Sequence, residues 1–200
     1  SDPTASESIG QMWYNTTSNV LKYSIEGAGA WASGNDMTVP RDTGGFCGTQ
    51  TAALSIAGSP PATSNSNVCE NYDGTSWSAV NNLNVSRLNN AGLGTTTAAM
   101  NAGGELPPVT YATSESWNGT CWTAANNINT ARRSFRGCGT QTAGMVAFGV
   151  AGGANNTDTE TYDGTSWTAE NEGLTARNNS ANCGTTTAAV AAGGTTPPGI

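Results

Sequence analysis

Histidine is absent from the 200 residues of this chain, and charged residues make up only 10% of it. The first absence excludes histidine-based catalytic triads, imidazole metal ligands and the commonest general base of enzymes. The second is far below the roughly one quarter of charged residues in an average soluble protein. Solubility must therefore rest on hydroxyl and amide side chains, helped by a net charge of −7.

Positive charge is the scarcest kind, because Lys22 is the only lysine and the total of lysine and arginine is 7. Four of the arginines recur at regular spacing, so no basic stripe remains to grip phosphates or an anionic membrane. No apolar run reaches the roughly 18 residues of a membrane-spanning helix. We therefore expect neither a nucleic-acid partner nor a membrane span.

The 5 cysteines are an odd number, so at least one thiol is unpaired. Three of them lie six residues after an arginine, and a leucine takes the fourth equivalent position: Cys47, Cys138, Cys183 and Leu93. A position that accepts cysteine or leucine is most simply a small apolar packing site. The alternative is a metal held by a ring of thiols, but Leu93 interrupts that ring and no CxxC motif supports it. We expect no disulfide scaffold, no metal and no other cofactor.

The first residues differ from the rest of the chain. Residues 1–8 are rich in serine, threonine and acidic residues and are predicted to form a flexible arm, with a repeat domain over residues 9–200. The chain does not start with methionine, and its first residues lack the charged and apolar regions of a signal peptide. We therefore expect either a processed chain or a segment of a longer one.

One short pattern recurs: a glutamate, an aromatic residue, Asp-Gly or Asn-Gly, and a tryptophan seven residues after the glutamate. Asp-Gly and Asn-Gly supply the positive φ angles of a tight turn, so each copy predicts two strands joined as a hairpin. With a looser first copy, the tryptophans lie 46, 45 and 45 residues apart: Trp31, Trp77, Trp122 and Trp167. Their fixed place predicts packing in the core between repeats.

Each repeat also carries an arginine ten residues after its tryptophan. The arginines are Arg41, Arg87, Arg132 and Arg177, and the recurring glutamates are Glu70, Glu115 and Glu160. This repetition predicts Arg–Glu ion pairs that link strands or blades. A glycosidase would need two carboxylates facing a cleft about 5 to 10 Å apart, and nothing marks two of the 14 acidic residues in that way. We therefore expect no enzymatic activity.

The strand pattern predicts an all-β fold, because each period holds four short strands with turn signals and no helical periodicity. Repeats of roughly 40–50 residues with four strands are typical of a β-propeller. The chain opens with an outer hairpin, from Trp13 to Trp31, and closes with an inner one, from Ser180 to Gly194. We expect these halves to join, so that N-terminal strands complete the last blade of a closed four-bladed ring. The alternative is a slice of a longer propeller or fibre.

From about residue 20 to residue 194 the order of these motifs resembles the kelch repeat. Gly103-Gly104, Gly152-Gly153 and Gly193-Gly194 match the double glycine of that family, whereas the first repeat departs from it with Ala57-Gly58. Tyr72 and Tyr162 match its aromatic position, where Trp117 stands in the second repeat. The resemblance implies a kelch-like β-propeller. Some kelch proteins are copper oxidases, but the histidine ligands for that activity are missing.

A narrower resemblance is to the degenerate kelch-like repeats of tailed-phage virion proteins, particularly marine ones. It rests on Asn118-Gly-Thr-Cys-Trp-Thr123 followed by Asn129-Thr-Ala-Arg132 and Gly139-Thr-Gln-Thr142. The segment Trp13-Tyr-Asn-Thr-Thr-Ser-Asn-Val-Leu-Lys22 is similar to a short module of phage tail and fibre proteins. Both resemblances imply a non-enzymatic virion protein on a tail, fibre or capsid surface.

Such a protein would contact other virion proteins through its N-terminal segment and host-surface glycans or proteins through its loops. Trp13 and Trp117 lie outside the tryptophan series and are the candidate ligand contacts. The alternative is a lectin-like binding module that is secreted by a bacterium or lies on its surface.

Overall fold

The computed structural model describes residues 34–62 and 66–196, together with the strands at 12–15 and 20–23. The chain divides into two compact units, residues 1–34 and 35–200. The first unit contains one antiparallel pair, β1 (Met12–Asn15) and β2 (Val20–Tyr23). The predicted boundary after residue 8 lies outside the described residues.

The second unit is built from antiparallel sheets, and the described residues contain no helix, so the all-β prediction is confirmed. Accordingly, none of the described elements is a helix long and apolar enough to cross a membrane. The first sheet has the strand order β3 (Gly45–Thr49), β4 (Ala52–Gly58), β5 (Ser66–Tyr72) and β6 (Trp77–Val80). The second has the order β7 (Ala91–Gly94), β8 (Ala99–Ala102), β11 (Ser114–Trp117) and β12 (Trp122–Ala125).

The third sheet follows the same plan with β13 (Arg136–Gly139), β14 (Gly144–Ala147), β17 (Thr159–Tyr162) and β18 (Trp167–Ala169). Two ribbons extend the links inside the second and third repeats: β9 (Glu105–Leu106) with β10 (Val109–Thr110), and β15 (Val150–Ala151) with β16 (Ala154–Asn155). The fourth sheet has two strands, β19 (Ala181–Thr185) and β20 (Ala188–Ala192).

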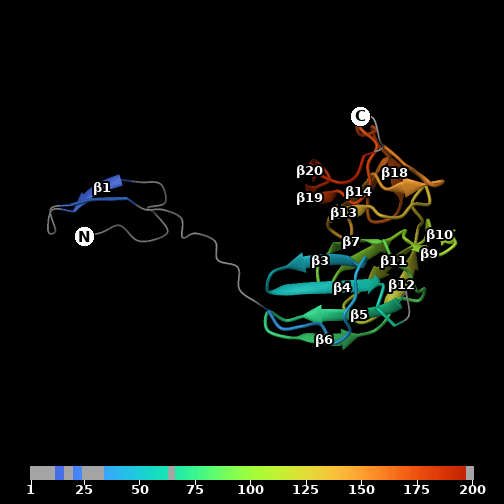
Figure 1. Cartoon of the computed structure of the whole chain (residues 1–200), viewed down its shortest axis with the longest axis horizontal. Coiled ribbons are helices and arrows are strands. Elements are labelled where there is room, and N and C mark those ends of the chain that lie inside the picture. Colours follow the sequence, from blue (N-terminus) through green and yellow to red (C-terminus); the bar gives the residue numbers. More distant parts are fainter. Residues whose placement is uncertain (1–11, 16–19, 24–33, 63–65, 197–200) are drawn as a thin grey trace. The chain divides into compact units, whose positions relative to one another are not determined.

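The four sheets are arranged in chain order through their first strands (Figure 1). Strand β3 lies beside β7, β7 beside β13, and β13 beside β19. Residues of all four strands line one pocket of about 210 Å³, mostly with glycine. Glycine is required at Gly92, because a Cβ there would come within 2.9 Å of the backbone nitrogen of Phe46 in the neighbouring sheet. The first strands therefore approach one another at backbone distance.

The outer hairpins form as their turn residues predict. In the third sheet the Asp163 carboxylate accepts hydrogen bonds from the N–H groups of Thr165 and Ser166, at 2.8 and 2.7 Å, and Gly164 has a φ of 95°. Tyr162 then pairs with Trp167 across the two strands, with ring centroids 4.9 Å apart. This hairpin buries both rings, each about 6% exposed.

The apolar core consists of two clusters that lie between neighbouring sheets. One joins the first and second sheets through residues such as Leu54, Ile56 and Trp117. The other joins the second and third sheets through residues such as Met100, Phe135 and Val146. Each sheet thus buries its faces against the next repeat, as stacked repeats do.

The expectation that N-terminal strands complete the last blade of a closed ring stays a prediction. β1 and β2 are hydrogen-bonded to each other in a two-stranded sheet, and the fourth sheet is likewise two-stranded. In the sequence, Ser24 stands seven residues before Trp31, where the other repeats have the glutamate that faces an arginine. No described strand pairs with the outer edge of β20.

The tight turn between the first two strands of a sheet gives the first prediction. Gly94 has a φ of 102°, and a Cβ on it would lie 2.3 Å from the carbonyl oxygen of Ala98. We expect Gly94→Ala to lower the free energy of unfolding by about 2 kcal/mol or more, because strain and a backbone clash add. Urea denaturation followed by tryptophan fluorescence measures this loss.

Gly119→Ala is the matched control, since Gly119 has a φ of 90° but its nearest neighbour would be 3.4 Å from the new Cβ. Its free energy of unfolding should fall by about 1 kcal/mol, the cost of placing a non-glycine residue at a positive φ without a clash. Equal losses in the two variants would contradict the close approach at Gly94.

Candidate functional site

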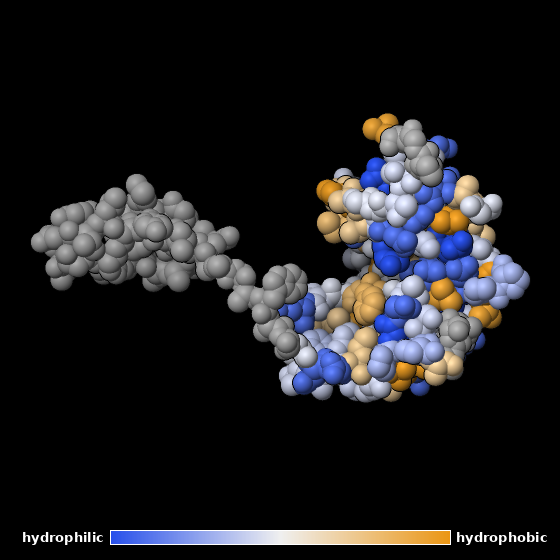
Figure 2. Space-filling model, viewed as in Figure 1, coloured by the Kyte–Doolittle hydropathy of each residue, from blue (hydrophilic) through white to orange (hydrophobic). Residues whose placement is uncertain are grey.

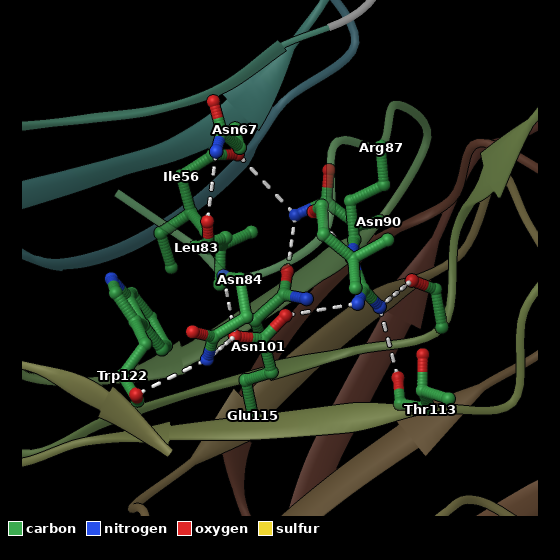
Figure 3. A network of polar contacts seen from close by, with 12 residues as sticks. Ile56, Asn67, Leu83, Asn84, Arg87, Asn90, Asn101, Thr113, Glu115 and Trp122 are labelled. Carbon is green, nitrogen blue, oxygen red and sulfur yellow. Dashed lines mark hydrogen bonds and ion pairs between the residues drawn. The ribbon is translucent and has the colours of Figure 1, made fainter. Parts of the chain in front are cut away.

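The recurring polar residues meet in a buried network, shown for the second sheet in Figure 3. Nη2 of Arg87 donates to Oε1 of Glu115 at 3.0 Å, with the Arg87 side chain fully buried and that of Glu115 4% exposed. Nη1 of Arg87 donates to the carbonyl oxygens of Gly103 and Thr113, at 2.9 and 3.0 Å. The guanidinium thus links the end of the second strand to the start of the third.

The first and third sheets repeat this arrangement. Arg132 donates through Nη2 to Glu160 at 2.8 Å, and Arg41 forms the equivalent ion pair with Glu70. Burial lowers the pKa of Arg132 and the charge of Glu160 opposes that shift. Burial would raise the pKa of Glu70, but hydrogen bonds from Thr38 and Val39 and the charge of Arg41 together lower it. The Glu70 carboxylate is therefore held ionised against Arg41.

The sequence interpretation missed two further members of this network. The residue three positions before the arginine donates to the other glutamate oxygen: the backbone N–H and side chain of Asn84 bind Oε2 of Glu115 at 2.9 and 2.7 Å. Thr38 and Asn129 do the same for Glu70 and Glu160. The sequence could have indicated this role, because the position is polar in three repeats, whereas the fourth repeat has Leu174.

An asparagine six residues before each arginine joins successive repeats. Nδ2 of Asn81 donates to the carbonyl oxygen of Thr120, in the hairpin turn of the second sheet, at 2.7 Å. Asn35 and Asn126 make the same bond to Thr75 and Thr165, at 2.6 and 2.7 Å. The fourth asparagine of the series is Asn171.

The structure describes the side chains of three of the four recurring tryptophans, and two of these three are buried in the core. Trp122 and Trp167 are 5% and 6% exposed, and Trp77 is half-buried against Tyr72 with ring centroids 5.1 Å apart. Trp31 lies outside the described residues. Of the ligand candidates, Trp13 lies on β1, whose side chains are not among those described.

The ligand candidate Trp117 is wrong, because its side chain is only 2% exposed and belongs to the core between the first two sheets. Its Nε1 donates to the carbonyl oxygen of Thr96 at 2.9 Å. The aromatic position of the hairpin is a packing position in the second repeat as in the others, so no face of this ring is left for a ligand.

The cysteines are all free thiols. Cys47 and Cys138 line the pocket between the first strands together with Leu93, as a small packing position would. Burial, with a smaller effect of nearby Cys69, raises the pKa of Cys47 to about 12. Burial also raises the pKa of Cys138. These thiols are therefore protonated and weakly nucleophilic at neutral pH.

Among the described residues, no three acidic or cysteine side chains lie close enough together to hold a metal ion. A shallow pocket of about 130 Å³ beside Glu160 gathers Asp158, Glu170 and Glu172. The carboxylate of Glu160 is already occupied by Arg132 and Asn129. Thr161 donates to Glu170 and Thr157 donates to Glu172, each at 2.7 Å.

The surface carries no single concentrated site in the view of Figure 2, where apolar residues of the second unit are scattered among hydrophilic ones. Large exposed apolar side chains include Phe46 at the pocket of the first strands, Leu174, which is fully exposed, and Val190, which is 63% exposed. The last two both belong to the fourth repeat.

No protein-family model matches the chain, and no curated protein matches it. Among solved structures, 131 chains match. One is the structure of YjhT, which aligns with a TM-score of 0.57 and 11% sequence identity, covering 80% of this chain and 51% of that chain. The chain thus spans about half the length of that protein, and the likeness shows a shared fold alone.

The buried ion pair gives the second prediction. Glu115→Gln keeps the side-chain volume but leaves the buried Arg87 charge without its carboxylate. We expect the free energy of unfolding at pH 7 to fall by about 3 kcal/mol or more. Chemical denaturation measures it, with Glu105→Gln as the control.

Glu105 pairs with Arg133 at 3.2 Å, but the side chain of Arg133 is 35% exposed. Loss of such a pair is expected to cost about 1 kcal/mol or less. If Glu115→Gln were no more damaging than Glu105→Gln, the buried pair would not have the structural role described above.

The hairpin turns give a prediction on pH. Hydrogen bonds from the N–H groups of Ser166 and Thr165 lower the pKa of Asp163, although its carboxylate is exposed. A lowered pKa in the folded state stabilises the protein above the unfolded value of about 3.9, and this contribution is lost as the pH falls through the folded value. Asp163→Asn should therefore lose less thermal stability than the wild type between about pH 5 and pH 2.5.

The second sheet shows that asparagine can replace aspartate in this turn, since Oδ1 of Asn118 accepts the equivalent hydrogen bonds from the N–H groups of Thr120 and Cys121, both at 2.9 Å. At pH 7 the Asp163→Asn variant should keep a melting temperature near that of the wild type. Asp36→Asn, a change at an exposed aspartate that is not a turn residue of the third sheet, serves as the charge-matched control. An unchanged acid dependence of Asp163→Asn would refute the role of the turn carboxylate.

Proposed function

We propose that this chain is a non-enzymatic structural protein of a tailed-phage virion, displayed on a tail, fibre or capsid surface. One observation carries the structural role: in each four-stranded sheet the recurring arginine and glutamate are buried and bound to each other. The charged residues that recur are thus used to join strands, and none of these pairs is left to act on a substrate.

The proposal includes a kelch-like β-propeller as the architecture. Its support is the arrangement of the first strands side by side around one pocket and the repeat of three sheets with the same strand order. Closure of four such sheets into a ring would make each sheet a blade.

The virion location rests on the resemblance of the repeats and of the Trp13–Lys22 segment to phage tail and fibre proteins. Attachment to other virion proteins through the N-terminal segment follows from the same resemblance. A virion assembled in the reducing bacterial cytoplasm also suits a chain whose thiols are all free. The loops of the repeat domain would then face outward and contact a glycan or protein on the host surface.

Quantitative mass spectrometry of purified particles tests the location. We expect the chain at a fixed copy number relative to the major capsid protein through successive density gradients. Absence from particles, with recovery from the bacterial envelope and binding on a glycan array, would overturn the virion proposal in favour of a lectin-like surface module. Turnover of any polysaccharide would overturn the non-enzymatic assignment.

A further inference from the structure

The fourth repeat keeps the residues that hold an outer hairpin, but the described residues contain no hairpin in that place. In the second sheet β11 pairs with the outer edge of β8, with Glu115 opposite Asn101. The equivalent strand of the fourth repeat is β20, which pairs with β19 alone. Val190 is 63% exposed, whereas the equivalent Met100 is fully buried.

Arg177 is placed as the other arginines are. Its Nη1 donates to the carbonyl oxygen of Gly193 at 3.0 Å, as that of Arg87 does to Gly103 at 2.9 Å. The described residues place no carboxylate within ion-pair distance of Arg177, whereas Arg41, Arg87 and Arg132 each have a glutamate. The guanidinium is thus oriented for a partner that a third strand would carry.

Two neighbours of Arg177 point to the same conclusion. Asn171 is the fourth of the asparagines that bind a hairpin turn, and within the described part its side-chain amide has no hydrogen-bond partner. Leu174, at the position that binds the glutamate in the other repeats, is fully exposed. Within the described part of the chain, the fourth repeat therefore has an unpaired strand edge on β20 and a guanidinium without a carboxylate, on Arg177. Among the same residues it also has an unbonded amide on Asn171 and two exposed apolar side chains, Leu174 and Val190.

We propose that the outer edge of β20 is a binding site for a β-hairpin of a partner protein, whose first strand carries glutamate followed two residues later by tyrosine or tryptophan. The strand adds antiparallel to β20, with its glutamate opposite Ala191 and on Arg177, and its aromatic residue opposite Ala189. This register repeats Glu115 opposite Asn101 and Trp117 opposite Ala99. Three copies of the same recognition inside this chain define the chemistry.

This inference goes beyond the virion proposal and does not depend on it. The chain's own N-terminal segment is a poorer occupant, because Ser24 stands where the glutamate would be. A hairpin that brings the carboxylate satisfies Arg177, pairs the edge of β20 and covers Val190 at once. Strand addition of this kind draws affinity from main-chain hydrogen bonds and specificity from side-chain pockets.

The test uses the full chain and a synthetic peptide with the sequence of residues 157–170, the outer hairpin of the third sheet. Calorimetric titration should show one binding site, and the same peptide with Glu160→Gln should bind at least about tenfold more weakly. Hydrogen exchange of the full chain should show that the β20 amides facing away from β19 are open without peptide and protected with it.

The matched protein variants are Arg177→Gln and Arg133→Gln, which change the net charge equally. Arg177→Gln should bind both peptides alike, and Arg133→Gln should keep the preference for glutamate. Failure of the peptide to bind, or equal binding of both peptides by the wild type, overturns the proposal.

Protection, in the full chain without peptide, of the β20 amides that do not bind β19 also overturns it. Light scattering then identifies the occupant, since a monomer indicates the chain's own N-terminal segment and a dimer indicates a second copy.

Discussion

The buried pairing of one guanidinium with one carboxylate in each four-stranded sheet is the interaction on which the rest of the fold depends. In the second sheet the arginine precedes the first strand, the glutamate lies on the third, and the Arg87 side chain also holds two backbone carbonyls between them. A buried ion pair of this kind contributes little net free energy compared with apolar packing, but losing one partner is costly. The pair therefore selects this strand arrangement over others, and the apolar clusters between sheets supply most of the stability.

Uncharged polar side chains take over tasks that ion pairs perform elsewhere. Three asparagine amides bind the hairpin turns of the four-stranded sheets. The amide oxygen of Asn118 organises its turn as the carboxylate of Asp163 does in the third sheet. These bonds are local to a repeat or to a pair of neighbours. A chain in which 10% of residues are charged can thus satisfy its backbone groups and remain acidic on its surface.

Much of this arrangement could be predicted from the sequence, because the same residues recur at the same spacing in successive repeats. The spacing of Trp77, Trp122 and Trp167 placed the hairpins, and the joint repetition of arginine and glutamate indicated which side chains meet. Trp117 was misjudged, because it lies outside the tryptophan series while occupying the aromatic position that is tyrosine in other repeats. The roles of Asn84 and Asn129 were missed, since asparagine is common in this chain and its partners depend on the approach of neighbouring sheets. The pairing of β1 with β2 is the hairpin that the sequence pattern indicates, but such a pattern does not say which sheet edge the hairpin joins.

The stacking of sheets through glycine-lined first strands gives the repeat domain a direction. Each sheet contacts mainly its neighbours, so local stability follows from how many neighbours a repeat has and how completely its own strands are paired. The second sheet is packed on both sides, whereas β20 has an exposed residue at every second position. Opening of the native state should start at the two-stranded fourth sheet and reach the better-packed second sheet last.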